Sequence, residues 1–534
     1  MGSHIPVLIV GAGPTGLLMA CELARRGIAF RIIDIKAERT LTANAVGIQP
    51  RTLELLDNLG LAHQFLKLGQ ACKAAHLHAD GKDLARISFE HLDSFYHFIL
   101  ALPQSETERL LNAHLVEQGH TVERPLEFSA LTHEDNRPLS CTLTSLDSNQ
   151  QEILSCDWLL ACDGANSRVR ELCQIPFPGD DLSEQFIVAN TDMSSFLSNS
   201  ELHVFFNKGT LLLAIPLGAQ HYRISVNLHQ SPRKFLGEKE VKEMIQERSQ
   251  GDYDVNAVSW ISPFWIHSKI VKNLRHGPIF LAGDAAHVHS PAGAQGMNTG
   301  LQDAYNLAWK LAMVIQGQAP QTLLDSYQAE RYPLLSGIVK YTETFTKIAL
   351  HENPIVLKLR PWFFKVLNHF PLLAKKFSQR LTQLSLRYKN SAVIDYSSSL
   401  GRQAPQPGER IPDVWINQTN RLHTYLRLPE HKLLLFTGLG ASEKTLEKIT
   451  TLQQQLALHY SKTIHVFIIA DKKWAGLEPL LVDERKALHQ RFQAQGAACY
   501  LIRPDNYLAY CSKSLDFTRL QTFLKRYILE NDLV

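Results

Sequence analysis

The sequence has no long hydrophobic run and no large surplus of one charge. No stretch approaches the roughly 18 consecutive apolar residues that a membrane-spanning helix needs. The 55 Lys and Arg residues nearly balance the 52 Asp and Glu residues, and a dedicated nucleic-acid-binding protein usually carries a basic surplus. The N-terminal residues also lack the regions of a secretion signal. We therefore expect a soluble, cytoplasmic protein that neither binds nucleic acid nor enters a membrane.

Paired cysteine motifs are lacking as well. The eight cysteines are scattered and none forms a CxxC pair, which excludes a disulfide framework of the small secreted type and a zinc ribbon. His287 and His289 lie two residues apart, but a zinc site needs three or four ligands, and no further Cys or carboxylate stands at ligand spacing. We expect reduced, mostly structural thiols and no metal.

The chain does have length and an ordinary globular composition. Its 534 residues are too many for one compact domain, so two or three domains are expected. Hydrophobic residues make up 45% and charged residues 20%, which excludes wholesale disorder.

A phosphate-binding pattern opens the sequence. Residues 5–10 form a β-branched apolar run, typical of a buried parallel strand, and residues 17–27 read as a helix. In a GxGxxG loop between them, one glycine allows a tight turn, the next admits a pyrophosphate and the last permits close packing of helix and strand. The phosphates would meet the helix N-terminus. The candidate cofactor-binding residues of the loop are Gly11, Gly13, Pro14, Thr15 and Gly16.

An acid follows at the end of the next predicted strand, residues 30–34. Asp34 stands about 18 residues beyond Gly16, near the position of a ribose-binding carboxylate. Together these features predict a dinucleotide site, without deciding between FAD and NAD.

Two later segments repeat the pattern of a strand that ends in an acid. The strand at residues 153–162 leads into Asp163 and Gly164, and the strand at residues 277–282 leads into Gly283 and Asp284. Because ligands bind at the carboxyl ends of such strands, Asp284 is placed to hydrogen-bond a ribose or ribityl hydroxyl.

A long predicted helix follows the second of these segments after a glycine-rich loop. Its first backbone N–H groups, on Gly296, Met297 and Asn298, suit an anionic edge of a ligand.

The three motifs in this order resemble the single-component flavoprotein aromatic hydroxylases, which include para-hydroxybenzoate, phenol and polyketide hydroxylases. Residues 46–56 and 102–110 also resemble stretches of that family. The resemblance implies bound FAD, with NAD(P)H and O₂ as co-substrates.

The same resemblance implies roles for individual residues. Gln104 would contact the flavin, Asp163 and Gly164 would serve FAD and NAD(P)H, and Asp284 would hold the ribityl chain. The flavin-ring environment, with no acid or base assigned, would comprise Pro291, Gly296, Met297 and Asn298.

One position departs from the family pattern. Many relatives carry a basic residue that touches FAD just before the Val46 stretch, where this chain has Asn44. Lys36, which we include among the cofactor-binding residues, or Arg39 could substitute. The departure bears on flavin mobility and nicotinamide docking.

We predict an α/β protein in three parts: a Rossmann-like FAD domain of the para-hydroxybenzoate hydroxylase type, an interleaved mainly-β substrate domain and a C-terminal thioredoxin-like α/β domain. Residues 501–510 resemble the tail of phenol and polyketide hydroxylases, and the lack of CxxC leaves packing or dimerisation as the role of this domain. Phe205, Phe206 and Tyr222 are interpreted as core residues. The predicted boundaries are 1–72, 100–180 and 268–345 for the FAD domain, 73–99 and 181–267 for the substrate domain, 346–398 for a helical linker and 399–534 for the C-terminal domain.

The resemblance implies a monooxygenase that inserts one oxygen atom of O₂ into a phenolic or polyketide-like aromatic substrate through a flavin C4a-hydroperoxide. A disulfide reductase would need a second GxGxxG and a CxxxxC, and a flavin halogenase would carry tryptophans where this chain has residues 211–216. Two alternatives stay open: a monooxygenase that inactivates an antibiotic of the rifamycin or tetracycline type, and a catalytically idle flavin-binding protein. Homodimerisation is also left open.

Overall fold

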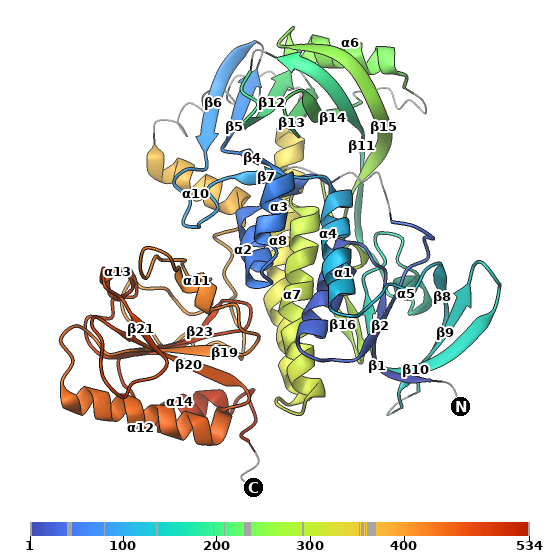
Figure 1. Cartoon of the computed structure of the whole chain (residues 1–534). Helices are drawn as coiled ribbons and strands as arrows, with labels where there is room; N and C mark the ends of the chain where they lie inside the picture. Colours follow the sequence, from blue (N-terminus) through green and yellow to red (C-terminus); the bar gives the residue numbers. More distant parts are fainter. Residues whose placement is uncertain are drawn as a thin grey trace.

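A computed structural model shows two sheet-containing regions joined by long central helices, with a C-terminal α/β domain beside them (Figure 1). The structure describes residues 3–39, 45–79, 81–134, 137–195, 197–207, 209–228, 236–290, 293–351 and 370–531, together with Asn353, Leu357, Leu359 and Trp362, but not the side chains of 181–184 and 371.

The N-terminal sheet has seven strands, of which five follow the order β16-β17-β10-β1-β2. Strands β2, β1, β10 and β17 are parallel, and the residues at their carboxyl ends are apolar and buried, as is typical of parallel strands. An antiparallel hairpin, β8 and β9, extends β10. The strands are β1 (His4–Val10), β2 (Phe30–Ile33), β8 (Leu126–Thr132), β9 (Leu139–Ser145), β10 (Gln151–Ala161), β16 (Arg275–His276) and β17 (Ile279–Leu281).

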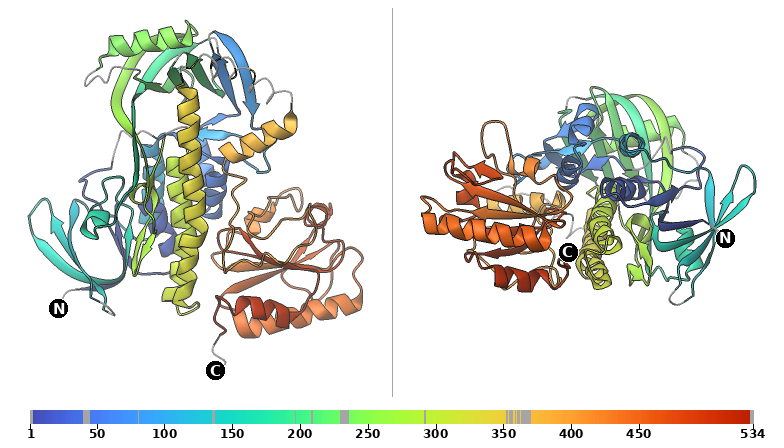
Figure 2. Two further views of the ribbon diagram at one scale, coloured as in Figure 1. Left: turned by 180° about the vertical axis from the view of Figure 1, so that it is seen from behind. Right: turned by 60° about the horizontal axis from the view of Figure 1, so that its bottom comes forward.

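Helices pack against this sheet, and α7 and α8 run through the centre of the molecule (Figures 1 and 2). Helix α7 is buried almost throughout its length, and α1 packs closely against it. The helices of this region are α1 (Pro14–Arg25), α2 (Pro50–Asn58), α3 (Ala62–Leu68), α4 (Gln104–Glu117), α5 (Arg168–Leu172), η1 (Gly283–Ala285), α7 (Gly296–Ile315), η2 (Gln321–Leu324), α8 (Asp325–Ala349) and α10 (Pro371–Leu381).

An eight-stranded sheet, in the order β18-β15-β11-β14-β13-β12-β5-β6, forms the second region. Helix α6 (Glu238–Ser249) covers its outer face, away from α7 and α8 (Figures 1 and 2). Phe205 and Tyr222 are buried under this helix, and Phe206 is buried in a separate core with Ala349 of α8. The strands are β5 (Ala74–Ala79), β6 (Lys82–Ser88), β11 (Gly179–Ser195), β12 (Glu201–Asn207), β13 (Thr210–Pro216), β14 (His221–Asn227), β15 (Tyr253–Ile270) and β18 (His287–Val288).

A small three-stranded sheet lies between these regions. Its strands are β3 (Gly47–Ile48), β7 (Ile99–Ala101) and β4 (Gln70–Cys72), paired in that order.

The C-terminal domain has the thioredoxin-like topology that the sequence predicts. Strand β19, helix α12 and strand β20 form a parallel βαβ unit, and β22 and β23 follow as antiparallel strands before α14, in the sheet order β21-β20-β19-β22-β23. The elements are α11 (Leu422–Tyr425), β19 (His431–Phe436), α12 (Glu443–Tyr460), β20 (Ile464–Ala470), β21 (Leu480–Val482), α13 (Ala487–Arg491), β22 (Ala498–Ile502), β23 (Leu508–Ser512) and α14 (Phe517–Leu524).

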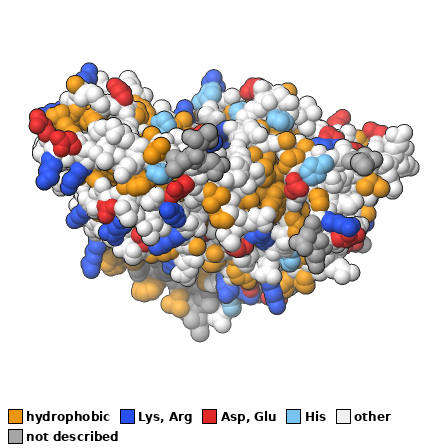
Figure 3. Space-filling view, turned by 90° about the horizontal axis from the view of Figure 1, so that it is seen from below, with side chains coloured by type: hydrophobic (Ala, Val, Ile, Leu, Met, Phe, Trp, Pro, Cys, Tyr) orange, Lys and Arg blue, Asp and Glu red, His pale blue; other side chains and the backbone are white. Residues whose placement is uncertain are grey.

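The predicted fold class is therefore confirmed, whereas the individual domain boundaries stay predictions. All eight cysteines are free thiols. Acidic and basic side chains are interspersed on the face shown in Figure 3, in keeping with the balanced composition. In the described part of the chain, no helix is long and apolar enough to cross a membrane.

Candidate functional site

The sequence motifs converge at one edge of the N-terminal sheet. The parallel register pairs Val10 with both Ile33 and Ala161, and Ala161 with Leu281, so the carboxyl ends of four strands lie level. Each motif begins at or just beyond one of these ends. The fold thus gathers Gly11, Asp34, Asp163, Gly283 and Asp284 at the edge where ligands of such sheets bind.

The GxGxxG loop can approach β10 only because it is built from glycine. Gly11 has a φ of +98°, and a Cβ there would lie 2.4 Å from the Cys162 carbonyl oxygen. A Cβ on Gly16 would lie 1.9 Å from the Gly11 carbonyl oxygen. A Cβ on Gly13, by contrast, would meet no described atom within 4 Å. The open side of Gly13 leaves room for a ligand against the backbone, beside the start of α1.

Thr15 of α1 also lies close to two glycines of the Gly283–Asp284 segment and the helix that follows it. The Thr15 Oγ1 would lie 2.5 Å from a Cβ on either Gly283 or Gly300, so the first turn of α1 packs directly against η1 and α7. Pro14 occupies the first position of α1, where its missing N–H costs nothing.

Asp34 is held in place by backbone N–H groups. Its Oδ2 accepts a hydrogen bond of 2.7 Å from the Ala12 N–H, and its Oδ1 accepts one of 2.9 Å from the Lys36 N–H. The Arg124 guanidinium lies 3.9 Å from Oδ1. Because each carboxylate oxygen can accept more than one hydrogen bond, Asp34 can still bind a hydroxyl.

Gln104 is the first residue of α4 and lies near Asp34 and Arg124. Its amide donates a 2.9 Å hydrogen bond to Glu108 Oε1. Burial raises the pKa of Glu108, while Gln104, Lys36 and Arg124 oppose that rise. The structure therefore brings Lys36, Gln104 and Asp34 into one neighbourhood, and Arg39 reaches it by donating to the Ser105 carbonyl oxygen at 3.0 Å. Asn44 lies outside the described residues.

One carboxylate oxygen of Asp163 accepts a hydrogen bond from a described residue, and the other does not. Its Oδ2 accepts the Val169 N–H at 3.1 Å, at the start of α5, whereas the buried Oδ1 has no hydrogen-bond partner among the described residues. Burial raises the pKa of this carboxyl group. Gly164 follows with a φ of +83°, and a Cβ there would meet no described atom within 4 Å.

Asp284 exposes its side chain between the buried residues Gly283 and Ala285. The surrounding protein nevertheless raises its pKa, with His287 opposing the rise. A carboxyl group that is accessible yet surrounded by protein is better suited to hydrogen-bond a hydroxyl group of a ligand than to interact with bulk water alone.

A buried ion pair between Asp303 and Arg331 supports the turn that carries Asp284. Asp303 of α7 accepts the Gly283 N–H at 3.1 Å and the His287 Nε2 at 2.7 Å, and Arg331 of α8 donates to it at 2.7 Å. Burial would raise the pKa of Asp303, but Arg331 and His287 hold it below its ordinary value.

Neither the pair of Asp303 with Arg331 nor the contacts of one further cation, Arg170, were predicted from the sequence. Arg170 donates to the carbonyl oxygens of Ala165 at 2.6 Å and Ala285 at 2.9 Å, and so ties the Asp163 loop to the Asp284 turn. Arg170 and Asp303 stand inside the motif segments, but nothing in their spacing signals partners more than a hundred residues away or on another helix.

The start of α7 is not capped by a side chain in the described structure. The amide of Gln295, at the N-cap position, donates instead to the carbonyl oxygens of Gly293 and Leu381. The first-turn N–H groups of Gly296, Met297 and Asn298 therefore remain available to an anionic group.

The Asn298 side chain has a role that the sequence did not suggest. Its Oδ1 accepts the Gln49 N–H at 2.8 Å and its Nδ2 donates to the Gly47 carbonyl oxygen at 2.8 Å. It thereby fixes the β3 segment against the start of α7. Pro291 lies outside the described residues.

Comparison with known families identifies the cofactor of this chain. A family described as FAD binding domain matches residues 4–342, and one described as aromatic-ring hydroxylase, C-terminal, matches residues 404–528. The chain belongs to the FAD-dependent aromatic-ring hydroxylases. It is accordingly a flavoprotein monooxygenase that uses FAD with NAD(P)H and O₂.

Individual relatives agree along most of the chain. The 6-methylpretetramide 4-monooxygenase of Streptomyces rimosus is 31% identical over 525 residues, covering 94% of this chain and 90% of the relative. A rifampicin monooxygenase of Streptomyces venezuelae is 30% identical, covering 72% of this chain and 79% of the relative. The solved structure of the anhydrotetracycline hydroxylase OxyS from Streptomyces rimosus superposes with a TM-score of 0.77 at 27% identity, covering 98% of this chain and 99% of that one.

The residues present fit FAD. The open backbone at Gly13, the unpartnered Asp163 Oδ1, the accessible Asp284 and the uncapped start of α7 all lie on the carboxyl side of one sheet. The family assignment leaves the catalytically idle alternative without support, while the roles of single residues remain predictions.

Proposed function

We propose that this flavoprotein monooxygenase hydroxylates a polycyclic phenol of the aromatic polyketide type. The pretetramide and anhydrotetracycline enzymes named above each match at least nine-tenths of this chain and of their own length. The match thus includes the eight-stranded sheet, which in this proposal forms the wall of the substrate site.

The inner face of that sheet supports a planar apolar substrate. Leu213 and Ile215 of β13 pack with Ala101 of the three-stranded sheet and with Val46, which directly precedes β3. This face is therefore continuous with the β3 segment that Asn298 anchors to α7. Apolar side chains here would exclude water from the reacting ring.

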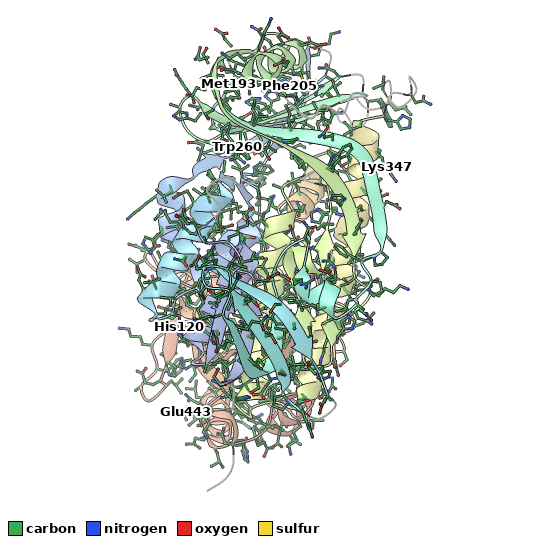
Figure 4. All side chains as sticks on the ribbon, turned by 90° about the vertical axis from the view of Figure 1, so that its right-hand side faces the viewer. His120, Met193, Phe205, Trp260, Lys347 and Glu443 are labelled. Carbon is green, nitrogen blue, oxygen red and sulfur yellow. The ribbon has the colours of Figure 1, made fainter. Side chains whose placement is uncertain are left out.

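A buried cation on the same face is suited to a phenolic oxygen. Arg223 lies 5.0 Å from the ring of Trp260, which Figure 4 shows on the side of the sheet opposite to Met193 and Phe205. Its Nε also donates to Asn190 Oδ1 at 2.6 Å. Burial lowers the pKa of Arg223 to about 10, so the guanidinium still carries its charge at neutral pH. We assign Arg223 to the recognition of an ionised phenol or enol.

Asp34 and Asp284 would hold hydroxyl groups of the cofactor, and the first N–H groups of α7 would face the negatively charged edge of the flavin. FAD, when bound, accepts a hydride from NAD(P)H and activates O₂, so that one oxygen atom enters the substrate and the other leaves as water. The protein orients the aromatic ring and keeps the site dry.

Anaerobic stopped-flow bleaching of the flavin tests this proposal. NADPH and NADH would each be mixed with the enzyme in the presence of simple phenols, polycyclic phenolic polyketides or rifamycins. Acceleration by the polycyclic phenols alone is expected. Equal rates with and without every such ligand would contradict the proposed substrate class.

Inactivation of an antibiotic is the second candidate, and the similarity to a rifampicin monooxygenase favours it. Acceleration by rifamycins, with no response to other polycyclic phenols, would select this function instead.

A further inference from the structure

Three histidines lie together on the outer face of the eight-stranded sheet. His76 and His78 lie two residues apart on β5, so their side chains point to the same face of the sheet. His203 of β12 pairs with His76 in the parallel register of the two strands. One ring nitrogen of each histidine lies within 4.8 Å of the others. The His78 ring stacks on Phe205 at 4.4 Å between centroids, and Phe205 belongs to the core under α6. The cluster is thus on the opposite face from Trp260 and Arg223.

Hydrogen bonds to outer partners define which nitrogens carry protons. His203 Nε2 lies 2.9 Å from the Ser198 carbonyl oxygen, which can only accept, so this nitrogen bears the hydrogen. His78 Nδ1 lies 3.0 Å from Asp83 Oδ1, and the same argument places a hydrogen there. The remaining nitrogens, His78 Nε2 and His203 Nδ1, then face each other 3.1 Å apart, both with lone pairs.

Two facing lone pairs repel each other unless a cation lies between them. When both rings are neutral, a metal ion between these two nitrogens would accept both lone pairs, and neutral imidazole is the form that binds metal ions.

We propose that His76, His78 and His203 form a binding site for a divalent transition-metal ion such as Zn²⁺. Zinc takes imidazole nitrogens at about 2.0–2.1 Å, which separates tetrahedral ligand atoms by roughly 3.3 Å, close to the distance between His78 and His203. Asp83 and the Ser198 carbonyl orient the two rings from behind, as the outer partners of metal-bound histidines do. His76 supplies the third nitrogen and lies between Asp83, at 3.4 Å, and Glu201, at 3.6 Å.

A cavity gives the ion a route and a fourth ligand. His78 opens on a space of about 220 Å³ at the surface of the sheet, whose charged lining comprises Asp83, Asp252 and Arg248. This is enough for a water molecule on the metal. The site would tie β5, β6 and β12 together, and its place under α6, on the face opposite Trp260 and Arg223, makes it a structural centre.

Zinc titration of the full-length, FAD-loaded enzyme tests the proposal. After treatment with a chelator and gel filtration, Zn²⁺ would be added in competition with a chromophoric chelator. One tightly bound equivalent is expected, with a submicromolar Kd and a higher melting temperature. His78→Ala and His203→Ala should weaken binding at least 100-fold, and Asp83→Asn about 10- to 100-fold.

His221→Ala is the matched control, because His221 pairs with Asp192 on the same sheet but lies outside the cluster. Its affinity for Zn²⁺ should equal that of the wild type. Co²⁺ should give the intense visible bands of a tetrahedral site in the wild type and in His221→Ala. Absence of a tight equivalent in the wild-type protein would overturn the proposal, whatever the folding of the variants. Tight binding that persists in both His78→Ala and His203→Ala would overturn it as well.

Discussion

At the scale of single residues, the strongest expectation concerns Asp284. Its carboxyl group is exposed, yet crowded by protein, at the end of β17. Replacement by Ala removes a charged hydrogen-bond partner, which is worth about 1.5–3 kcal/mol, so FAD affinity should fall roughly 10- to 100-fold. Flavin content after gel filtration and fluorescence titration would measure the loss. Asp157→Ala, which changes an exposed acid on β10, should retain full flavin occupancy; full occupancy in Asp284→Ala would reject the assignment.

Arg223 gives a second prediction at this scale. Arg223→Gln should raise KM for a phenolic substrate roughly tenfold, because it removes a charge-assisted contact, while flavin content stays unchanged. Arg248→Gln is the control: Arg248 is also a cation whose pKa burial lowers to about 10, but it lies on α6, where it donates to the Asn227 carbonyl oxygen. Steady-state kinetics that show equal KM values for the two variants would contradict a substrate role for Arg223.

Residues with local patterns were predictable, and residues with distant partners were not. Gly11, Gly16 and Asp34 follow from short motifs whose backbone geometry is the same wherever they occur. Asp303 supports the Asp284 turn through Arg331, on another helix, and no pattern along the chain signals that contact. The same reason explains why the His203 contact with His78 was missed.

At the scale of elements, the packing of α1 against η1 and α7 depends on small residues. A Cβ on Gly300 would lie 2.5 Å from Thr15 Oγ1 and 3.1 Å from the Gly283 Cα, so Gly300→Ala must shift the Thr15 side chain and press α7 against η1. We expect a lower melting temperature and weaker FAD retention, measured by thermal unfolding and flavin fluorescence.

Gly337→Ala is the matched change in a second central helix. Gly337 lies exposed in α8, and a Cβ there would meet no described atom within 4 Å. Because alanine favours the helix, this variant should be more stable by about 0.5–1 kcal/mol. Similar losses of stability and flavin in both variants would show that the close approach at Gly300 does not matter.

The four parallel strands of the N-terminal sheet, β1, β2, β10 and β17, were predictable at this scale because each of them ends in a recognisable motif. The eight-stranded sheet was harder: β5 and β6 come from a segment far from β11–β15, and only the pairing of β5 with β12 unites them. Alternating apolar residues show that strands exist but not which ones are neighbours.

At the scale of the whole molecule, buried charges fasten the C-terminal domain to the central helices. Arg503 lies 2.5 Å from Glu330 of α8 and also contacts Asp505, and Lys310 of α7 lies 2.8 Å from Glu330. Trp309 donates to Asp505 at 3.4 Å. The domain therefore has a packing role, as predicted for a thioredoxin-like fold without CxxC, and dimerisation stays a prediction.

Glu330→Gln should destabilise the protein strongly, because it leaves the buried Lys310 without its carboxylate and removes one of the two carboxylates that Arg503 contacts. The expected loss is about 3–5 kcal/mol, against less than about 1 kcal/mol for Asp325→Asn, which disrupts the surface pair with Arg275. Denaturant unfolding of both variants measures the difference. Losses of equal size would contradict the proposed docking role.

The Glu330 carboxyl group also predicts how the stability of the protein depends on pH. Burial alone would raise the pKa of Glu330, but Arg503 and Lys310 hold it well below its ordinary value of 4.5. Since the folded pKa is the lower one, the stabilisation is present above pH 4.5 and is lost as the pH falls below it. Acid unfolding of wild type and Glu330→Gln should therefore converge toward low pH; a constant difference in stability would exclude Glu330 as the source.

The most direct test of the account is incubation of the FAD-loaded enzyme with NADPH, a polycyclic phenol and ¹⁸O₂, followed by mass spectrometry of the product. The account predicts one ¹⁸O atom in the product, consumption of NADPH in equal amount and little H₂O₂. Oxidation of NADPH that yields only H₂O₂, with the phenol unchanged across the substrate panel, would contradict it.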